Sequence, residues 1–395
     1  MDFEFSPEEL DFVADVRRFI AAQKALPDAA EVMAPQREAD SMLADSPARR
    51  AFNRRLAEAG YLGMSWGREY GGQEKSGVHD YLLNEELASV GAPLIGKGVG
   101  CIGKTLIAHG SEKLKREFLP KILRAEIEFA LGYSEPAAGS DLASLQLRAV
   151  RDGDDWVLNG QKMWTTSAHF ADWYWVAART DPDAPKHKGI SVFLLPMDHP
   201  GLTVTEIRTM GDHRTNQVFF DDVRVPGDYL VGNANEGWTY VCEALDYERF
   251  TMFTVGPIRV KFDALIELLR ITRRDGAALA DDPLLRRSVA RLAAELETAT
   301  MLQRRVIAAA MKGAVPTVEA AMYKLYSTEL GRRMADLALD ALGPEGLLRH
   351  DAPDAPAAGK WEHSYRATVV DTIGGGSSEV QKNIIARRGL GLPLR

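Results

Sequence analysis

The chain has 395 residues, more than a single hydrophobic core usually accommodates, so two or three domains are expected. Its net charge of −8 is unfavourable for nucleic acid binding, and no apolar run approaches the roughly 18 residues of a membrane span. The first residues, MDFE, do not resemble a signal peptide, and Cys101 and Cys242 are too few for a disulfide framework or a metal site. We therefore expect a cytoplasmic protein that binds neither nucleic acid nor membrane.

Residues 1–128 are predicted to form an N-terminal helical domain. The run SPEE at residues 6–9 combines a capping box with proline at the first helical position, so it predicts a helix start. Ser46-Pro47 predicts the start of a second helix and Gly60 its end. Further helical patterns lie near residues 76–90, 98–109 and 111–125, and no strand-like alternation precedes about residue 128.

Residues 129–232 are predicted to form a middle β domain, a barrel or sandwich. The run LQLRAVRDGDDWVLNGQKMW reads as two strands joined by a turn at residues 152–154. Four more strands are expected in DWYWVAART, GISVFLLPM, LTVTEIRTM and NQVFFDDVRV, which are rich in β-branched and aromatic residues.

Residues 233–395 are predicted to form a C-terminal four-helix bundle. Helical patterns cover residues near 235–271, 281–312, 317–342 and 377–388, and an Ala/Pro loop with Pro353 and Pro356 is expected between the last two. The expected fold is mainly α with a central β domain.

Two segments bordering the β domain carry the chemical signal. They read LGYSEPAAGSDLASL (131–145) and NGQKMWTTSAHFADWYWVAART (159–180). Their hydroxyls suit a polar ring edge or a phosphate, and Trp164 suits an aromatic face; the alternative is a pair of ordinary turns. There is no GxGxxG unit, Walker loop, zincin motif or nucleophile elbow. His169, His213 and His363 show no metal-ligand spacing and receive little weight as catalysts.

These segments resemble the flavin-binding signature of the acyl-CoA dehydrogenase family, and the helix–β–helix order is similar along essentially the whole chain. The resemblance implies noncovalent FAD between the β domain and the C-terminal helices. It also implies removal of hydrogens from Cα and Cβ of an acyl-CoA thioester, with an electron-transfer flavoprotein as acceptor. By position, cofactor contacts are expected from Leu131, Tyr133, Ser134, Gly139, Ser140, Trp164, Thr165, Thr166, Ser377 and Glu379, and substrate contacts from Ser140, Asp246, Arg249 and Arg387.

The catalytic base is expected outside the glycine loop TIGGGSSEVQ (372–381). In several family members a glutamate of this loop is the base, and Gly375 takes its place here. The backbone N–H of Gly375 remains to polarise the thioester carbonyl. LDYERF (245–250) resembles the helix that supplies the base in other branches, so Glu248 is the predicted proton acceptor, with a pKa raised by burial. The alternative is a surface carboxylate paired with an arginine.

Two departures from the family concern assembly. The usual Arg-x-x-Phe-Gly run, which reaches a neighbouring subunit's flavin, is missing; Arg273 or Arg274 replaces it only in part. Asp340 stands where a glutamine also reaches across. Similar gaps occur in dehydrogenases of steroid side-chain CoA esters, which are α2β2 heterotetramers with two flavins. We expect the base-carrying subunit of such an enzyme. A homotetramer, a flavin oxidase on the same scaffold and a non-catalytic partner subunit remain as alternatives.

Overall fold

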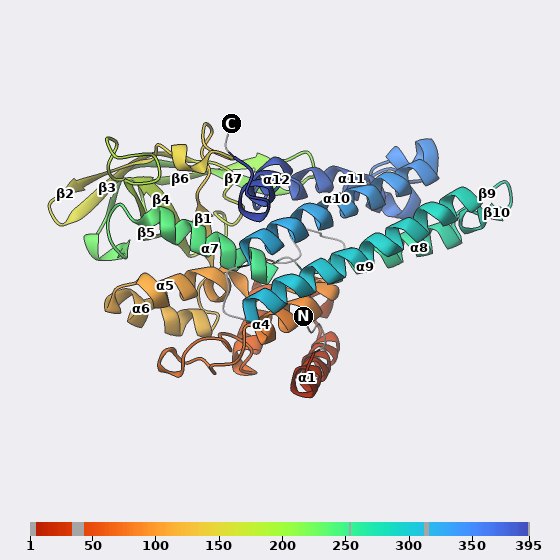
Figure 1. The fold of residues 1–395 in the computed structure, drawn as a ribbon, viewed down its shortest axis with the longest axis horizontal. Helices are drawn as coiled ribbons and strands as arrows, with labels where there is room; N and C mark the ends of the chain where they lie inside the picture. The colour runs from red at the N-terminus through yellow and green to blue at the C-terminus, as the bar shows by residue number, and fades with distance from the viewer. Residues whose placement is uncertain (1–4, 34–42, 253, 312–315, 394–395) are drawn as a thin grey trace.

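The computed structural model describes residues 5–33, 43–252, 254–311 and 316–393; the side chains of residues 248–252, 310 and 311 lie outside the described part. The chain forms helices, then a sheet, then helices, which confirms the expected fold (Figure 1). The β domain lies at one end of the molecule, with N-terminal helices beneath it. Long C-terminal helices run to the opposite end.

The N-terminal helices follow the predicted starts and stops. The capping box of the first helix is present, because Glu9 N donates to Ser6 Oγ at 3.3 Å and Ser6 N donates to Glu9 Oε2 at 2.7 Å. Phe12, Val16 and Ile20 are buried one helical turn apart. The helices are α1 (Pro7–Lys24), α2 (Ala29–Val32), α3 (Pro47–Glu58), α4 (Val78–Ser89), the π-helix η3 (Gly98–Ile102), α5 (Gly103–His109) and α6 (Glu112–Leu123).

The central sheet has eight strands in the order β6-β7-β3-β2-β4-β5-β8, and β1 pairs with β4 in parallel. The predicted hairpin is present, with Asp152 opposite Asp155. The strands are β1 (Phe129–Gly132), β2 (Arg148–Asp152), β3 (Asp155–Lys162), β4 (Trp173–Arg179), β5 (Ile190–Pro196), β6 (Leu202–Arg208), β7 (Arg214–Val225) and β8 (Leu230–Val231).

The C-terminal part differs from the sequence prediction in two places. The pattern near 235–271 is two helices, and the second starts at Gly256-Pro257, where proline suits the first helical turn. The expected loop around Pro353 and Pro356 ends sooner, because residues 360–371 form a further helix that packs on α10. The helices are α7 (Gly237–Met252), α8 (Gly256–Ile271), α9 (Pro283–Met311), α10 (Thr317–Leu342), α11 (Lys360–Asp371), α12 (Ser378–Ile384) and the π-helix η9 (Ile385–Gly389). A hairpin of β9 (Arg273–Arg274) and β10 (Ala277–Ala278) joins α8 to α9.

Helix α11 escaped prediction because its buried face is partly polar. Trp361 and Ala367 are buried on the same helix as Ser364 and Thr368, so the apolar residues alone show no helical period.

None of the described helices combines the length and apolar character needed to cross a membrane. Among the same residues there is no group of three or more His, Cys, Asp and Glu suited to a metal ion, and both cysteines are free thiols.

Candidate active site

A buried ion pair joins the two segments that carry the flavin-like signature. Lys162, at the end of β3, donates to Glu135 Oε1 at 2.7 Å and to the carbonyl of Tyr133 at 3.0 Å. Met163 N donates to Ser134 O at 2.8 Å. Lys162 is completely buried, and burial lowers its pKa to about 8 against the opposing effect of Glu135. The loop after β1 is therefore held against the residues that follow β3.

The Glu135 carboxylate also bonds to the residues that end the loop after β1. Glu135 accepts the backbone N–H groups of Gln146 and Leu147 at 2.6 and 2.9 Å. Neither Lys162 nor Glu135 was singled out in the sequence, because a charged residue at a strand end or in a loop usually faces solvent.

Trp164 occupies a bulge in the sheet. Lys162 pairs with Val218 of β7, but the next ladder contact is from Thr165 N to Asn216 O at 2.9 Å, which leaves one extra residue on the β3 side. Trp164 accordingly has a left-handed φ of 66°, and its side chain is 52% exposed. Asn216 secures the turn by donating its side-chain N–H to Thr165 O at 2.8 Å. The bulge thus presents a large aromatic face to the outside.

The other predicted cofactor residues divide into inward and outward groups. Tyr133 and Thr165 are buried, and the Thr165 hydroxyl bonds to the Tyr174 hydroxyl at 2.9 Å. Their side chains are therefore not available to a ligand outside the sheet. The outward group is exposed or half-buried: Ser134, Gly139, Ser140, Trp164 and Thr166. Leu131 is half-buried and packs against the core.

The glycine loop is held from inside the bundle. Lys324 Nζ of α10 donates to Gly376 O at 2.9 Å, and Gln381 Nε2 of α12 donates to the carbonyls of Gly375 and Gly376, both at 3.1 Å. Gly375 and Gly376 have φ values of 67° and 95°, which side-chain-bearing residues rarely adopt. Ser377 caps α12 by accepting Val380 N at 3.4 Å.

Glu379, the other cofactor residue predicted in this region, is exposed. Its own backbone N–H and the Ser377 hydroxyl lower its pKa.

The predicted base and substrate residues lie on α7 and η9. Glu248 and Arg249 belong to the last turn of α7, but their side chains lie outside the described residues. Asp246 is half-buried, and Thr317 Oγ1 of α10 donates to it at 3.4 Å. Arg387 is exposed in η9.

Two cavities flank the segment after Trp164. One has a volume of about 290 Å³ beside Thr166, and the structure gathers there the three histidines that received little weight. It is lined by Leu43, Asp45, Thr166, His169, Phe170, Asp212, His213, Arg214 and His363.

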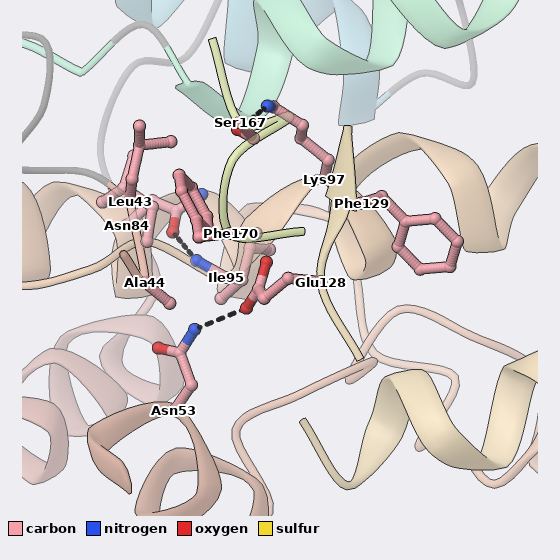
Figure 2. Close-up of a pocket in the computed structure, with 12 residues that line it drawn as sticks. Leu43, Ala44, Asn53, Asn84, Ile95, Lys97, Glu128, Phe129, Ser167 and Phe170 are labelled. Carbon is pink, nitrogen blue, oxygen red and sulfur yellow. Dashed lines mark hydrogen bonds between the residues drawn. The ribbon is translucent and has the colours of Figure 1, made fainter. Parts of the chain in front are cut away.

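The other cavity, of about 20 Å³, is shown in Figure 2. In it, Asn53 donates to Glu128 at 3.3 Å and Lys97 donates to Ser167 at 2.6 Å. Burial raises the pKa of Glu128 to about 7, although nearby Arg50 and Lys97 oppose the shift.

The arginines expected to reach a neighbouring flavin lie at the far end of the molecule. The β9–β10 hairpin is remote from the sheet in Figure 1. Arg274 Nη2 donates to Ala341 O at 2.6 Å, so this guanidinium is engaged within its own chain. Arg273 and Asp340 are exposed.

The outward groups fit a flavin. Trp164 offers an exposed aromatic face, Ser134 and Thr166 are half-buried hydroxyl residues on the two bonded segments, and a Cβ built on Gly139 meets no atom within 4 Å. An extended ligand with a flat ring and a polar tail can therefore lie along this edge.

Comparisons with known proteins agree with this geometry. The chain matches the family descriptions "Acyl-CoA dehydrogenase, N-terminal domain" over residues 6–126, "middle domain" over 130–223 and "C-terminal domain" over 235–390. It is 37% identical over 345 residues to the acyl-CoA dehydrogenase FadE26 of Mycobacterium tuberculosis, covering 86% of each protein.

Two solved structures are similar over the full length. The steroid ACAD Tcur3481-Tcur3483 matches with a TM-score of 0.87 and 34% identity, covering 100% of both chains. The ChsE4-ChsE5 complex from Mycobacterium tuberculosis matches with a TM-score of 0.87 and 33% identity, also covering 100% of both chains. The resemblance noted in the sequence is confirmed, and the chain belongs to the acyl-CoA dehydrogenase family, enzymes whose cofactor is FAD.

Proposed function

We propose that this chain is the base-carrying subunit of a heteromeric dehydrogenase that converts a bulky acyl-CoA, such as a steroid side-chain ester, to the trans-2-enoyl-CoA. The observation that carries the proposal is the glycine loop. Lys324 and Gln381 hold this loop in order, yet Gly375 brings no carboxylate to it. The base must then come from another element, and Glu248 on α7 is our candidate.

Trp164, Ser134, Thr166 and Ser140 would hold FAD, with Ser377 and Glu379 on the side of the C-terminal helices. When bound, FAD supplies the acceptor for the Cβ hydride. The aromatic face and the hydroxyls of the chain place the cofactor; they do not themselves take part in proton transfer.

The chain's own chemistry is the removal of the Cα proton. The Gly375 N–H polarises the thioester carbonyl, which stabilises the negative charge that develops on its oxygen. The Glu248 carboxylate accepts the proton, and Asp246, Arg249 and Arg387 line the path of the CoA ester. The missing side chain at Gly375 leaves room beside the reacting carbons, which favours a bulky acyl group.

Two observations support a heteromeric assembly: the absence of the cross-subunit run and the assembly of a similar solved structure. Arg274 is exposed and bonds through one nitrogen to Ala341 O of its own chain, and the cross-subunit run itself is absent from the sequence. One similar solved structure is a complex of two named chains, ChsE4 and ChsE5. We also propose an electron-transfer flavoprotein as the electron acceptor.

The test is Glu248→Gln, with Glu243→Gln as a matched control on the same helix. Glu243 bonds to His109 at 2.6 Å. Turnover of a panel of saturated straight-chain and steroid side-chain CoA esters should fall by about 10² to 10⁴-fold in Glu248→Gln, the usual contribution of a general base. FAD content should stay unchanged, and Glu243→Gln should keep wild-type turnover. Equal turnover in both variants would remove Glu248 as the base.

The same panel of CoA esters distinguishes the proposed dehydrogenase from an oxidase and from a non-catalytic subunit. Turnover that uses oxygen as efficiently as an artificial electron acceptor would indicate an oxidase. No turnover, even with a partner chain, would indicate a non-catalytic subunit.

A further inference from the structure

Lys324 is a buried cation that points at the backbone of the glycine loop. It lies on α10 and is completely buried, and its Nζ donates to Gly376 O at 2.9 Å. Gln381, also completely buried, donates to both Gly375 O and Gly376 O. Burying an ammonium group is costly, and the hydrogen bond to Gly376 O is one of the contacts that offset this cost.

These bonds determine the direction of two peptide groups. The described residues contain no cis peptide bond, and in a trans peptide the N–H points opposite to the C=O. With the carbonyls of Gly375 and Gly376 turned toward Lys324 and Gln381, the N–H groups of Gly376 and Ser377 point away from the bundle. The Gly375 N–H belongs to the preceding peptide, so these bonds hold the residue that carries this N–H but do not orient the N–H directly.

Glycine makes this arrangement possible but does not hold it. Gly375 and Gly376 can adopt their φ values of 67° and 95° because they have no side chain. For the same reason, many other backbone conformations are open to them. A Cβ on Gly376 would lie 2.6 Å from Gln381 Nε2, so the loop and Gln381 are in close contact. The buried ammonium also polarises the peptide that it contacts, which strengthens the N–H on the other side of that peptide.

We propose that Lys324 is a positioning residue for the reaction. By holding the Gly376 carbonyl inward, it orders the glycine loop, and the Gly375 N–H can polarise the thioester carbonyl only while that loop is ordered. The catalytic role of Lys324 rests on the proposed function. The ordering of the loop by Lys324 does not depend on that function.

The test compares Lys324→Met with Lys261→Met in the full-length chain, co-purified with its partner chain and FAD. Lys261 is also buried in the helical bundle and faces α10, where a Cβ on Gly331 would lie 4.0 Å from its Nζ. It therefore controls for the loss of a buried lysine. Gln381→Met is a second variant, which removes two bonds to the same carbonyls without removing a charge.

Hydrogen exchange of the peptide covering residues 372–378 is the deciding measurement. Lys324→Met and Gln381→Met should each raise its exchange rate by about tenfold or more at equal global stability, because the loop opens locally. Lys261→Met should leave it unchanged. Exchange that stays at the wild-type rate in Lys324→Met, or rises equally in Lys261→Met, would overturn the proposal.

Turnover then tests the catalytic part. With the ester that the wild type oxidises fastest, Lys324→Met should lower kcat by roughly 10²-fold, the usual effect of losing one preorganised donor, with little change in KM. Increased exchange with unchanged kcat would overturn the catalytic role of Lys324. A wild type without turnover would count against the proposed function alone, because the exchange result stands without it.

Discussion

Lys162 and Glu135 show how much one pair of residues contributes to the site. The ammonium and carboxylate are 2.7 Å apart and almost completely buried, and together they bond to three further backbone groups. Removing one member of such a pair leaves the other charge without compensation in a low-dielectric environment. The loop after β1 and the residues that follow β3, which carry the predicted cofactor contacts, are both held by this pair.

We predict that Lys162→Met lowers the free energy of unfolding by about 3–5 kcal/mol, the usual consequence of breaking a buried ion pair. The control is Lys186→Met, which breaks the exposed pair of Lys186 with Asp141 and should change stability by at most about 1 kcal/mol. Urea unfolding followed by circular dichroism measures both. Similar losses in the two variants would contradict a special role for the buried pair.

Glu128 makes stability depend on pH. Its pKa in the folded chain is about 7, above the ordinary value of 4.5, so between these values the folded state binds more protons than the unfolded state. Stability therefore falls as pH rises from about 4.5 to about 7. The penalty at pH 8 is on the order of 3 kcal/mol, following the size of the shift.

We predict that Glu128→Gln is more stable than the wild type at pH 8 and equally stable near pH 4.5. Melting temperatures across this range measure the difference. Glu126→Gln, which changes the exposed partner of Arg124 two residues away, is the control and should show no such gain at high pH. A constant difference between Glu128→Gln and the wild type at all pH values would contradict the shifted pKa.

At the scale of elements, the close approach of α4 and α8 supports the junction after α7. Glu85 of α4 accepts Val255 N at 2.9 Å, and burial raises the pKa of Glu85. A Cβ on Gly256 would lie 3.1 to 3.2 Å from atoms of Glu85 and Ser89. Glycine thus lets the start of α8 pack directly on α4, a few residues after the last turn of α7.

We predict that Gly256→Ala lowers the free energy of unfolding by about 1–3 kcal/mol, because the two helices must separate. Gly331→Ala is the contrast. A Cβ there meets only Lys261 Nζ, at 4.0 Å, so the gain in helix propensity should stabilise α10 by about 1 kcal/mol. Thermal unfolding measures whether each variant is destabilised or stabilised. Stabilisation in both variants would contradict a tight contact between α4 and α8 at Gly256.

At the scale of the whole molecule, the chain is built asymmetrically. The edge with Trp164 and Thr166 belongs to the β domain, whereas the hairpin that contains Arg274 lies at the opposite end (Figure 1). A contact from this hairpin to a flavin would have to reach another subunit. Within its own chain, one nitrogen of Arg274 bonds to Ala341 O. These features agree with the proposal that a different chain supplies the cross-subunit contacts.

We predict that the chain purified alone contains little FAD, and that co-expression with a neighbouring dehydrogenase chain gives a tetramer of both chains with two FAD. Native mass spectrometry and the flavin absorbance measure mass and stoichiometry together. The flavin absorbance per chain should rise from near zero for the chain alone to the value for one FAD per two chains in the complex. A yellow homotetramer with one FAD per chain would refute the heteromeric assembly.

Much of the fold was predictable because its signals are local. The capping box at Ser6 and the hairpin turn between Asp152 and Asp155 are read from neighbouring residues, and both are confirmed. Helix α11 was missed because Ser364 and Thr368 are buried through tertiary packing, which the residue type does not indicate. The boundaries at 128/129 and 232/233 and the role of Glu248 stay predictions.

The sequence by itself determined the order of helices and strands and the family, because caps, turns and the two flavin segments are continuous runs. Only the tertiary structure decided which distant groups support the site: Lys162 with Glu135, Asn216 with Thr165, and Lys324 with Gly376. The physical reason is burial. A lysine has the same sequence signature on a surface as in a core, and only the folded packing determines which backbone group it must satisfy.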